Sequence, residues 1–149
     1  MRLIACINCL FVFFTISAVD LSAAGLPKIA LQISSHVLSV EVANTQRSRA
    51  RGLMFRKSLD ENSGMLFVFP KSAYYGMWMK NTLIPLSVAF IDEEGFIINI
   101  ADMQPNSLFA YYSADLAKYA LEMNMGWFAR NRIHAGNRLF GLEHIPEAN

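Results

Sequence analysis

The sequence predicts a mainly β domain of the α+β class, built as a compact antiparallel barrel or sandwich with one or two short helices. Three observations predict this fold class. About seven short segments have alternating apolar residues or brief apolar runs, as strands do. Turn-forming residues separate these segments. The regular succession of strands and long helices that indicates a parallel sheet does not occur.

Two alternating segments predict the first hairpin. Every second residue is apolar in 29–33 and again in 38–42. Between them, Ser34, Ser35 and His36 suit a tight connection. We therefore expect two neighbouring antiparallel strands at the start of the domain.

A short helix is predicted after this hairpin. The segment TQRSRARGLMFR (45–56) has no run of β-branched residues, Thr45 is a suitable N-cap, and Gly52 suits the end of the first turns. Because no glutamate stands three residues after Thr45, we do not expect a complete capping box.

The middle of the chain predicts a buried strand and a second hairpin. The apolar run 65–69 has no polar face, so it is expected to be covered on both sides and to end at Pro70. Alternating apolar residues in 86–90 and 96–100 flank the turn sequence Asp-Glu-Glu-Gly at 92–95. This is the clearest local signal in the sequence.

The last third of the chain predicts one more long strand. Residues 119–125 alternate so that Glu122 and Asn124 fall on a polar face, opposite four apolar residues. One helical turn is expected at 127–132, and a Gly-Asn turn then leads into a short strand at 138–142.

The first 24 residues predict a secretory signal peptide. Arg2 precedes the uncharged apolar run 3–19, and Ser22 and Ala24 are small residues at the positions that signal peptidase requires. We expect cleavage after Ala24. The alternative is that the segment is kept as an uncleaved membrane anchor.

On this interpretation, residues 25–149 form a single domain of an exported protein, periplasmic or extracellular. Both cysteines, Cys6 and Cys9, lie in the signal, so the mature chain would have no disulfide or thiolate chemistry. The net charge of +1 does not predict a nucleic-acid partner. No later apolar stretch is long enough to span a membrane without a charge, and no cofactor is predicted.

The first candidate site is MWMKNT (77–82), which sets polar residues among large apolar ones. In an extended chain Met77, Met79 and Asn81 would point one way, and Trp78, Lys80 and Thr82 the other. One interpretation is a strand whose methionines pack inward, with Lys80 extending past Trp78 to solvent and the last two residues bonding a turn. The other is a ligand pocket walled by Trp78, with Lys80, Asn81 and Thr82 as its polar floor.

The second candidate is a group of five cations within eleven residues, without an acid between them: Arg47, Arg49, Arg51, Arg56 and Lys57. Arg47 and Arg51 would lie one turn apart on the same helix face. A solvated helix face is one interpretation. The other is a site for a carboxylate, a phosphate or an acidic glycan, since guanidinium binds such groups through two hydrogen bonds. Our preferred hypothesis joins Arg51 and Lys80 in one anion pocket.

The third candidate is a pair of thioethers. Met77 and Met79 would share a strand face and could bind Cu(I), although filling the core is the commoner use of methionine. His36, His134 and His144 have no spacing typical of a zinc site.

No nucleophile elbow, phosphate-binding glycine loop or His-Glu-x-x-His motif is present. Two classes of function therefore remain. The favoured one is a non-enzymatic binding module for a small anionic ligand or a cell-envelope component. The alternative is a small envelope hydrolase or lyase that uses Lys80 with Glu122 or Asp92 as its catalytic pair.

Several segments together resemble the domain of unknown function 192 family, also known as uncharacterised protein family 0127, in the order typical of that family. The resemblance covers about 31–142 and implies a mainly β domain, often exported in bacteria, with no established activity. Ser87 and Asn137 depart from the pattern, because aspartate is usual at both positions, so this chain lacks those two carboxylates. The segments are RARGLMFRKSL, GMLFVFP, MWMKNTLIPL, FIDEEGFIINI and YALEMNMGW.

Overall fold

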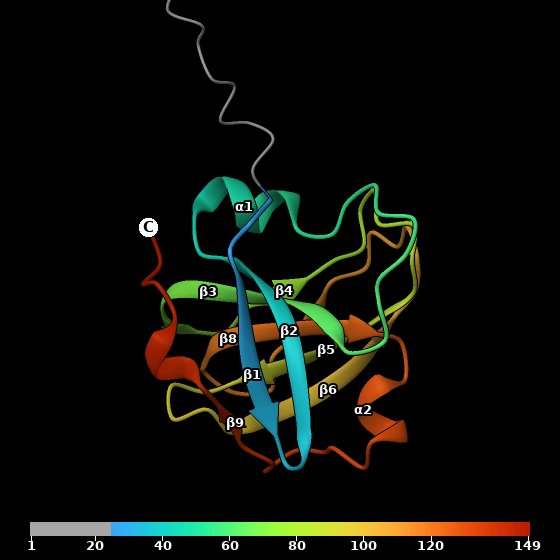
Figure 1. Ribbon diagram of the computed structural model, residues 1–149. Coiled ribbons are helices and arrows are strands. Elements are labelled where there is room, and N and C mark those ends of the chain that lie inside the picture. Colours follow the sequence, from blue (N-terminus) through green and yellow to red (C-terminus); the bar gives the residue numbers. More distant parts are fainter. Residues whose placement is uncertain (1–24) are drawn as a thin grey trace, which may run out of the picture.

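The computed structural model describes residues 25–149, so the predicted signal peptide and both cysteines lie outside the described residues. Within this range, a curled seven-stranded sheet forms a half-barrel in the order β6-β5-β8-β3-β2-β1-β9 (Figure 1). The mainly β fold class predicted from the sequence is confirmed. The strands of this sheet are β1 (Lys28–Ile33), β2 (His36–Ala43), β3 (Ser63–Ala73), β5 (Leu86–Ile91), β6 (Ile97–Met103), β8 (Ala117–Asn124) and β9 (Leu139–Phe140).

Shorter elements complete the described part of the chain. Strands β4 (Gly76–Met77) and β7 (Tyr111–Tyr112) pair as a separate ribbon. Two short helices, α1 (Gln46–Arg51) and α2 (Trp127–Arg130), lie outside the sheet, followed by one 3-10 turn, η2 (Leu142–His144) (Figure 1). None of the helices in the described range is long and apolar enough to cross a membrane.

The pairing of β2 with β3 is parallel, whereas the other strand pairs of the sheet are antiparallel. Parallel neighbours require a crossover connection, because the chain has to return to the end of the sheet from which it began. Residues 44–62 form this crossover and carry α1. The parallel pair therefore determines where the predicted basic helix lies.

Both predicted hairpins are confirmed, but the end of β3 was predicted wrongly. Strand β3 continues through Pro70 to Ala73. Its pairing with β8 shifts register between Val68 and Ala73, which leaves Pro70 where the ladder needs no amide donor.

The predicted helix is confirmed as α1, with Thr45 as its N-cap. The capping box is complete, contrary to the sequence prediction. The Ser48 amide donates to Thr45 Oγ1 and the Thr45 amide donates to Ser48 Oγ, each over 3.0 Å. A serine hydroxyl accepts the hydrogen bond that a glutamate carboxylate usually accepts, so the box does not need an acid. Gly52 ends the helix at a φ of 48°.

Two hydrophobic clusters cover the two faces of the central strands. Leu66 and Leu121 belong to one cluster, with Trp127 and Phe128 of α2 packed over it. Met65 and Phe67 belong to the other, beneath the crossover and the segment that follows β3. Strand β3 is thus buried on both faces, as predicted. The strands of the sheet and both clusters are formed by residues of the described range 25–149.

Gly64 of β3 leaves no room for a side chain. A Cβ at this position would overlap the Glu122 carbonyl oxygen and the Met123 sulfur of β8. We predict that Gly64→Ala lowers the free energy of unfolding by about 1–3 kcal/mol, because overpacking displaces the neighbouring backbone. Urea denaturation measures the change. Gly25→Ala is the control, since nothing lies within 4 Å of its Cβ. Equal midpoints for the two variants would contradict the packing described here.

Candidate ligand-binding site

A cavity of about 440 Å³ lies between α1, β3 and the segment that follows β3. It is on the side of the sheet that the crossover covers. Its volume is within the range of small-molecule sites. Residues from distant parts of the sequence line it: Gln46, Arg49, Ala50, Arg51, Gly52, Leu53, Met54, Phe67, Phe69, Pro70, Tyr75, Gly76, Met77, Trp78, Thr82 and Glu122.

Glu122 is the buried acid of this cavity. It lies on β8, between Met65 of β3 and Val88 of β5, in the middle of the sheet. The sequence pattern predicted a polar strand face here, which is wrong: only 3% of Glu122 is exposed. Burial raises the pKa of the Glu122 carboxyl to about 8, because the charged form loses its hydration. The group is therefore mainly neutral at pH 7 and can donate a hydrogen bond.

Aromatic side chains form much of the wall. The rings of Phe69 and Tyr75 are stacked, with 3.6 Å between their centroids and 11° between their planes. The Tyr75 hydroxyl donates to the Lys71 carbonyl, which fixes that ring at the cavity. Half of the Trp78 surface is exposed, so its indole is available on the solvent side. Such walls bury apolar ligand surface at little conformational cost.

The chain reverses its alternation at Asn81. Met77 and Met79 are buried while Trp78 and Lys80 are exposed, as an extended chain requires. Asn81 then has a φ of 54°, in the left-handed region that asparagine tolerates. The turn makes Asn81 exposed, contrary to the predicted facing of its side chain.

The same turn places the next residue, Thr82, in the cavity wall. Thr82 is 5% exposed, and its hydroxyl donates to the Lys80 carbonyl over 3.3 Å. The extended pattern put Thr82 on the side of Trp78 and Lys80, and the left-handed residue before it is the reason that this facing is wrong.

The predicted cations have different environments. The Arg49 guanidinium donates to the carbonyl oxygens of Asn44, Val68 and Asn149, so it holds the crossover to the sheet and to the end of the chain. Arg51 lines the cavity, is exposed to solvent and has no acidic partner among the described residues. Arg47 is exposed, one turn earlier on the helix, and does not line the cavity.

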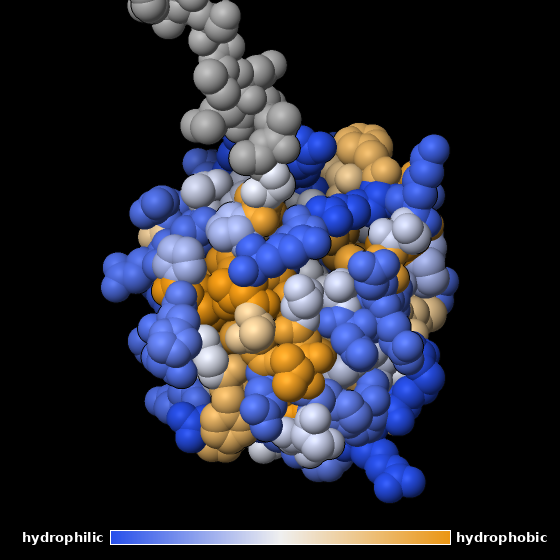
Figure 2. All heavy atoms as spheres, in the orientation of Figure 1, coloured by the Kyte–Doolittle hydropathy of each residue, from blue (hydrophilic) through white to orange (hydrophobic). Residues whose placement is uncertain are grey.

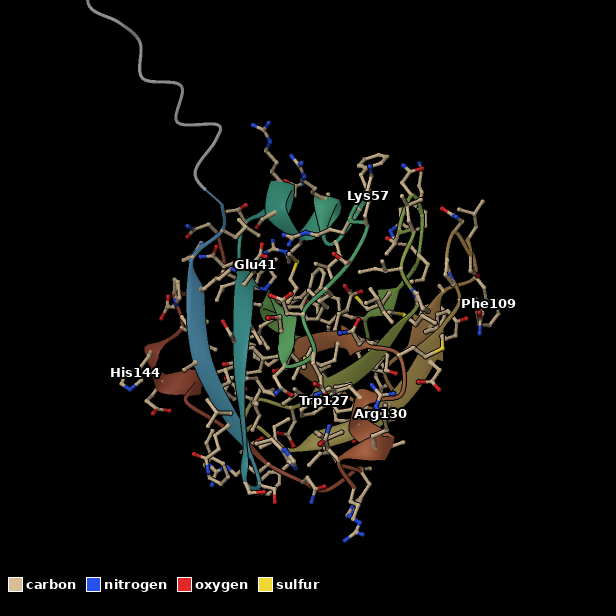
Figure 3. All side chains as sticks on the ribbon, turned by 45° about the vertical axis from the view of Figure 1, so that its right-hand side comes forward. Glu41, Lys57, Phe109, Trp127, Arg130 and His144 are labelled. Atoms are coloured by element: carbon tan, nitrogen blue, oxygen red, sulfur yellow. The ribbon has the colours of Figure 1, made fainter. Side chains whose placement is uncertain are left out.

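The other two members of the basic group lie beyond the helix. Arg56 forms an ion pair of 2.6 Å with Glu41, which Figure 3 labels beneath α1. Lys57 is exposed and has no acidic partner within the described range. The five cations therefore do not act as one repelling group.

The cavity joins only part of the predicted site. Arg51, Trp78 and Thr82 line it together, and Glu122, which we proposed only as a catalytic residue, joins them. Lys80 is not among the lining residues. Its Nζ lies 5.4 Å from the centroid of the Trp78 ring, in a cation–π contact. The shared pocket for Arg51 and Lys80 is thus not formed.

The remaining candidate residues, Asp92 and the methionine pair, do not come together in the cavity either. The Asp92 carboxylate accepts a hydrogen bond from the Phe96 amide in the β5–β6 turn and does not line the cavity. Met77 lines the cavity, whereas Met79 is fully buried in the core. Within the described residues, no three His, Cys, Asp or Glu side chains are grouped as metal ligands.

Sequence reasoning missed the aromatic wall. Phe67 and Phe69 were predicted only as core residues of a buried strand. Their alternation with Leu66 and Val68 put them on the same face as Met65, and Met65 is the register partner of Glu122. Only the β3–β8 register shows that these phenylalanines and the buried acid share a cavity.

The fold and the cavity together define a class of small half-barrel domain with a ligand-sized hollow beneath its crossover helix. The chain belongs to the DUF192 family, described as an uncharacterised ACR, which it matches over residues 29–141. The resemblance found from the sequence is thereby confirmed. None of the curated proteins compared with this chain matches it.

Two crystal structures are similar to this chain. One is a protein from Sinorhizobium meliloti 1021 that is named, provisionally, a transcription regulator; it has 34% sequence identity and a TM-score of 0.76. The match covers 78% of this chain and 95% of that one. The other, a protein of unknown function from Novosphingobium aromaticivorans DSM 12444, has 31% identity and a TM-score of 0.75 over 78% of this chain and 87% of its own.

The two residues that depart from the expected family pattern, Ser87 and Asn137, both form hydrogen bonds within the fold. Ser87 Oγ donates to the Asp102 carboxylate and accepts a hydrogen bond from the Gly126 amide. Asn137 Oδ1 accepts a hydrogen bond from the His134 amide within a turn. Neither residue lines the cavity that holds Glu122.

The raised pKa of Glu122 makes stability depend on pH. Between about pH 4.5 and 8, the unfolded chain loses the Glu122 proton while the folded chain keeps it. Folding stability therefore falls as pH rises through this window, by up to roughly 1.4 kcal/mol per pH unit, and the loss is complete above the folded pKa. We predict that Glu122→Gln removes this slope, measured by urea denaturation at several pH values. Parallel pH profiles for the two proteins would contradict the assignment.

Proposed function

We propose that this protein is a non-enzymatic binding module for a small ligand that has one anionic group and an apolar body. The observation that supports it is a single cavity lined by an exposed guanidinium, Arg51, by a buried carboxyl, Glu122, and by aromatic side chains. An amphiphilic ligand would match each of these parts.

Each part has a distinct role in the proposed complex. The Arg51 guanidinium would bind a carboxylate or phosphate through two hydrogen bonds, since none of the described acids competes for it. The wall of Phe69, Tyr75 and Trp78 would bury the apolar body. Protonated Glu122 would donate a hydrogen bond to an acceptor on the ligand, and because it is neutral it would not repel the anion.

The hydrolase or lyase alternative has less support. It requires Lys80 beside Glu122 or Asp92, and neither Lys80 nor Asp92 lines the cavity. A buried acid with a raised pKa is also found where a protein only binds its ligand. We therefore favour binding over catalysis.

The setting of the ligand follows from two further considerations. If the signal predicted at residues 1–24 directs export, the ligand is a component of the cell envelope or its surroundings. The Sinorhizobium meliloti relative is named as a regulator of transcription. The net charge of +1 gives little of the attraction to phosphates on which nucleic-acid binding depends, so we do not extend that assignment to this chain.

A binding assay with small amphiphiles tests the proposal. Calorimetry with residues 25–149 would use octanoate and phenyl phosphate, with octanol and phenol as neutral counterparts. We predict that an anionic probe binds and raises the melting temperature. Its neutral counterpart should bind at least about tenfold more weakly, since a charge-assisted hydrogen bond is worth roughly 1.5–3 kcal/mol.

Two arginines of the same helix provide a matched comparison. Arg51→Ala should weaken binding of the anionic probe by about tenfold or more, because it removes the guanidinium at the cavity. Arg47→Ala, one turn away and outside the cavity, should leave the affinity unchanged. Equal effects of the two substitutions would show that only the overall charge of the helix matters and would overturn the proposed site.

A further inference from the structure

Three loops that are distant in the sequence lie side by side at one end of the half-barrel. The Phe55 amide donates to the Asn81 carbonyl over 2.8 Å, which joins loop 52–59 to loop 78–85. Loop 104–110 joins the same turn from the other side, through hydrogen bonds from the Met79 amide to the Ser107 carbonyl and from the Asn106 amide to the Thr82 carbonyl, each 3.0 Å. The three loops are at the upper right in Figure 1.

Each loop exposes large apolar side chains. We call Phe55, Trp78, Leu83, Leu108 and Phe109 the apolar loop cluster; their exposed fractions are 63%, 50%, 49%, 70% and 68%. Figure 2 shows apolar side chains projecting among hydrophilic ones over these loops, and in Figure 3 Phe109 points away from the sheet. Exposed apolar groups gathered at one place typically mark an interaction surface.

The segments that carry the cluster hold charge of one sign. Residues 52–59, 78–85 and 104–110 include no aspartate or glutamate, and the acids of the connection between α1 and β3, Asp60 and Glu61, follow outside them. Lys57 and Lys80 are exposed beside the cluster, and neither has an acidic partner among the described residues. We therefore expect a partner that presents anionic groups at its surface, for the two lysines, and an apolar region just below them, for the cluster.

We propose that the apolar loop cluster docks on the surface of a lipid bilayer that contains anionic phospholipids. Phe55, Leu108 and Phe109 enter the boundary between headgroups and acyl chains, and Lys57 and Lys80 contact the phosphates. Trp78 lies at the headgroup level, where indole rings are favoured. Trp78 belongs to both the cavity wall and the cluster, but the docking does not require the ligand proposed for the cavity, because Leu108, Phe109 and Lys57 do not line it.

The chemistry of the surface favours a bilayer over a second copy of the chain. Copies that met through this face would bring Lys57 and Lys80 of each into one interface, and segments 52–59, 78–85 and 104–110 hold no acid to compensate them. An anionic bilayer supplies the opposite charge and an apolar layer at the same place.

Flotation with vesicles tests the proposal on residues 25–149, which contain both hydrophobic clusters. We expect binding to vesicles of phosphatidylcholine with phosphatidylglycerol and little binding to phosphatidylcholine alone. Leu108→Ser/Phe109→Ser should weaken the partition by about tenfold or more. Val37→Ser/Phe140→Ser, which removes comparable exposed side chains from the sheet, should not. Failure of the wild type to bind the mixed vesicles would overturn the proposal, as would equal weakening by both pairs.

Charge and fluorescence provide two further readouts. Lys57→Glu/Lys80→Glu should abolish binding to the mixed vesicles, whereas Arg130→Glu/Arg132→Glu, with the same change in net charge, should retain it. Figure 3 shows Arg130 well below Phe109. Brominated lipid should quench the fluorescence of the exposed Trp78 and leave that of the buried Trp127 unchanged.

The opposite results would overturn the proposal. Equal loss of vesicle binding in the two charge variants would show that binding depends on the net charge of the protein and not on Lys57 and Lys80. Emission unchanged by brominated lipid would show that Trp78 does not reach the bilayer. A dimer in ultracentrifugation that Leu108→Ser/Phe109→Ser dissociates would assign the cluster to a second copy instead.

Discussion

The parallel pairing of β2 with β3 is the constraint on which the candidate site depends. A hairpin would have joined these strands with a few residues, but the parallel arrangement requires the crossover 44–62. That crossover carries α1 over one face of the sheet, and the cavity forms beneath it. Arg49 fastens the crossover to carbonyl groups of both the sheet and the chain end. The position of Arg51 at the cavity follows from this backbone geometry.

A buried acid in the middle of a sheet has a cost that the fold must offset. Glu122 lies between Met65 and Val88 in the sheet, and its raised pKa reflects the unfavourable environment of the charged form. The two hydrophobic clusters supply the compensating stability. A group that weakens the fold and lines a cavity is the kind of feature that supports the proposed ligand site.

Local patterns predicted the strands well and the site only in part. Alternation at 29–33, 38–42, 86–90 and 96–100 identified both hairpins, because the pleat alone decides which side chains share a face. Two errors were local: the hydroxyl of Ser48 replaced the expected acid in the capping box, and the left-handed Asn81 reversed the alternation. The larger errors were not local. The burial of Glu122 and the absence of Lys80 from the cavity depend on the β3–β8 register and on the crossover, which no single segment encodes.

The crossover has a consequence for how such a domain diversifies. The hairpins β1–β2 and β5–β6 close through short turns that tolerate little change in length. The connection over the hollow lies outside the ladder, and lengthening a loop adds little to its closure entropy. Insertions or deletions there would resize or reshape the hollow and leave the scaffold as it is. Sequence drift in one stretch could thus give relatives with the same half-barrel different ligand preferences.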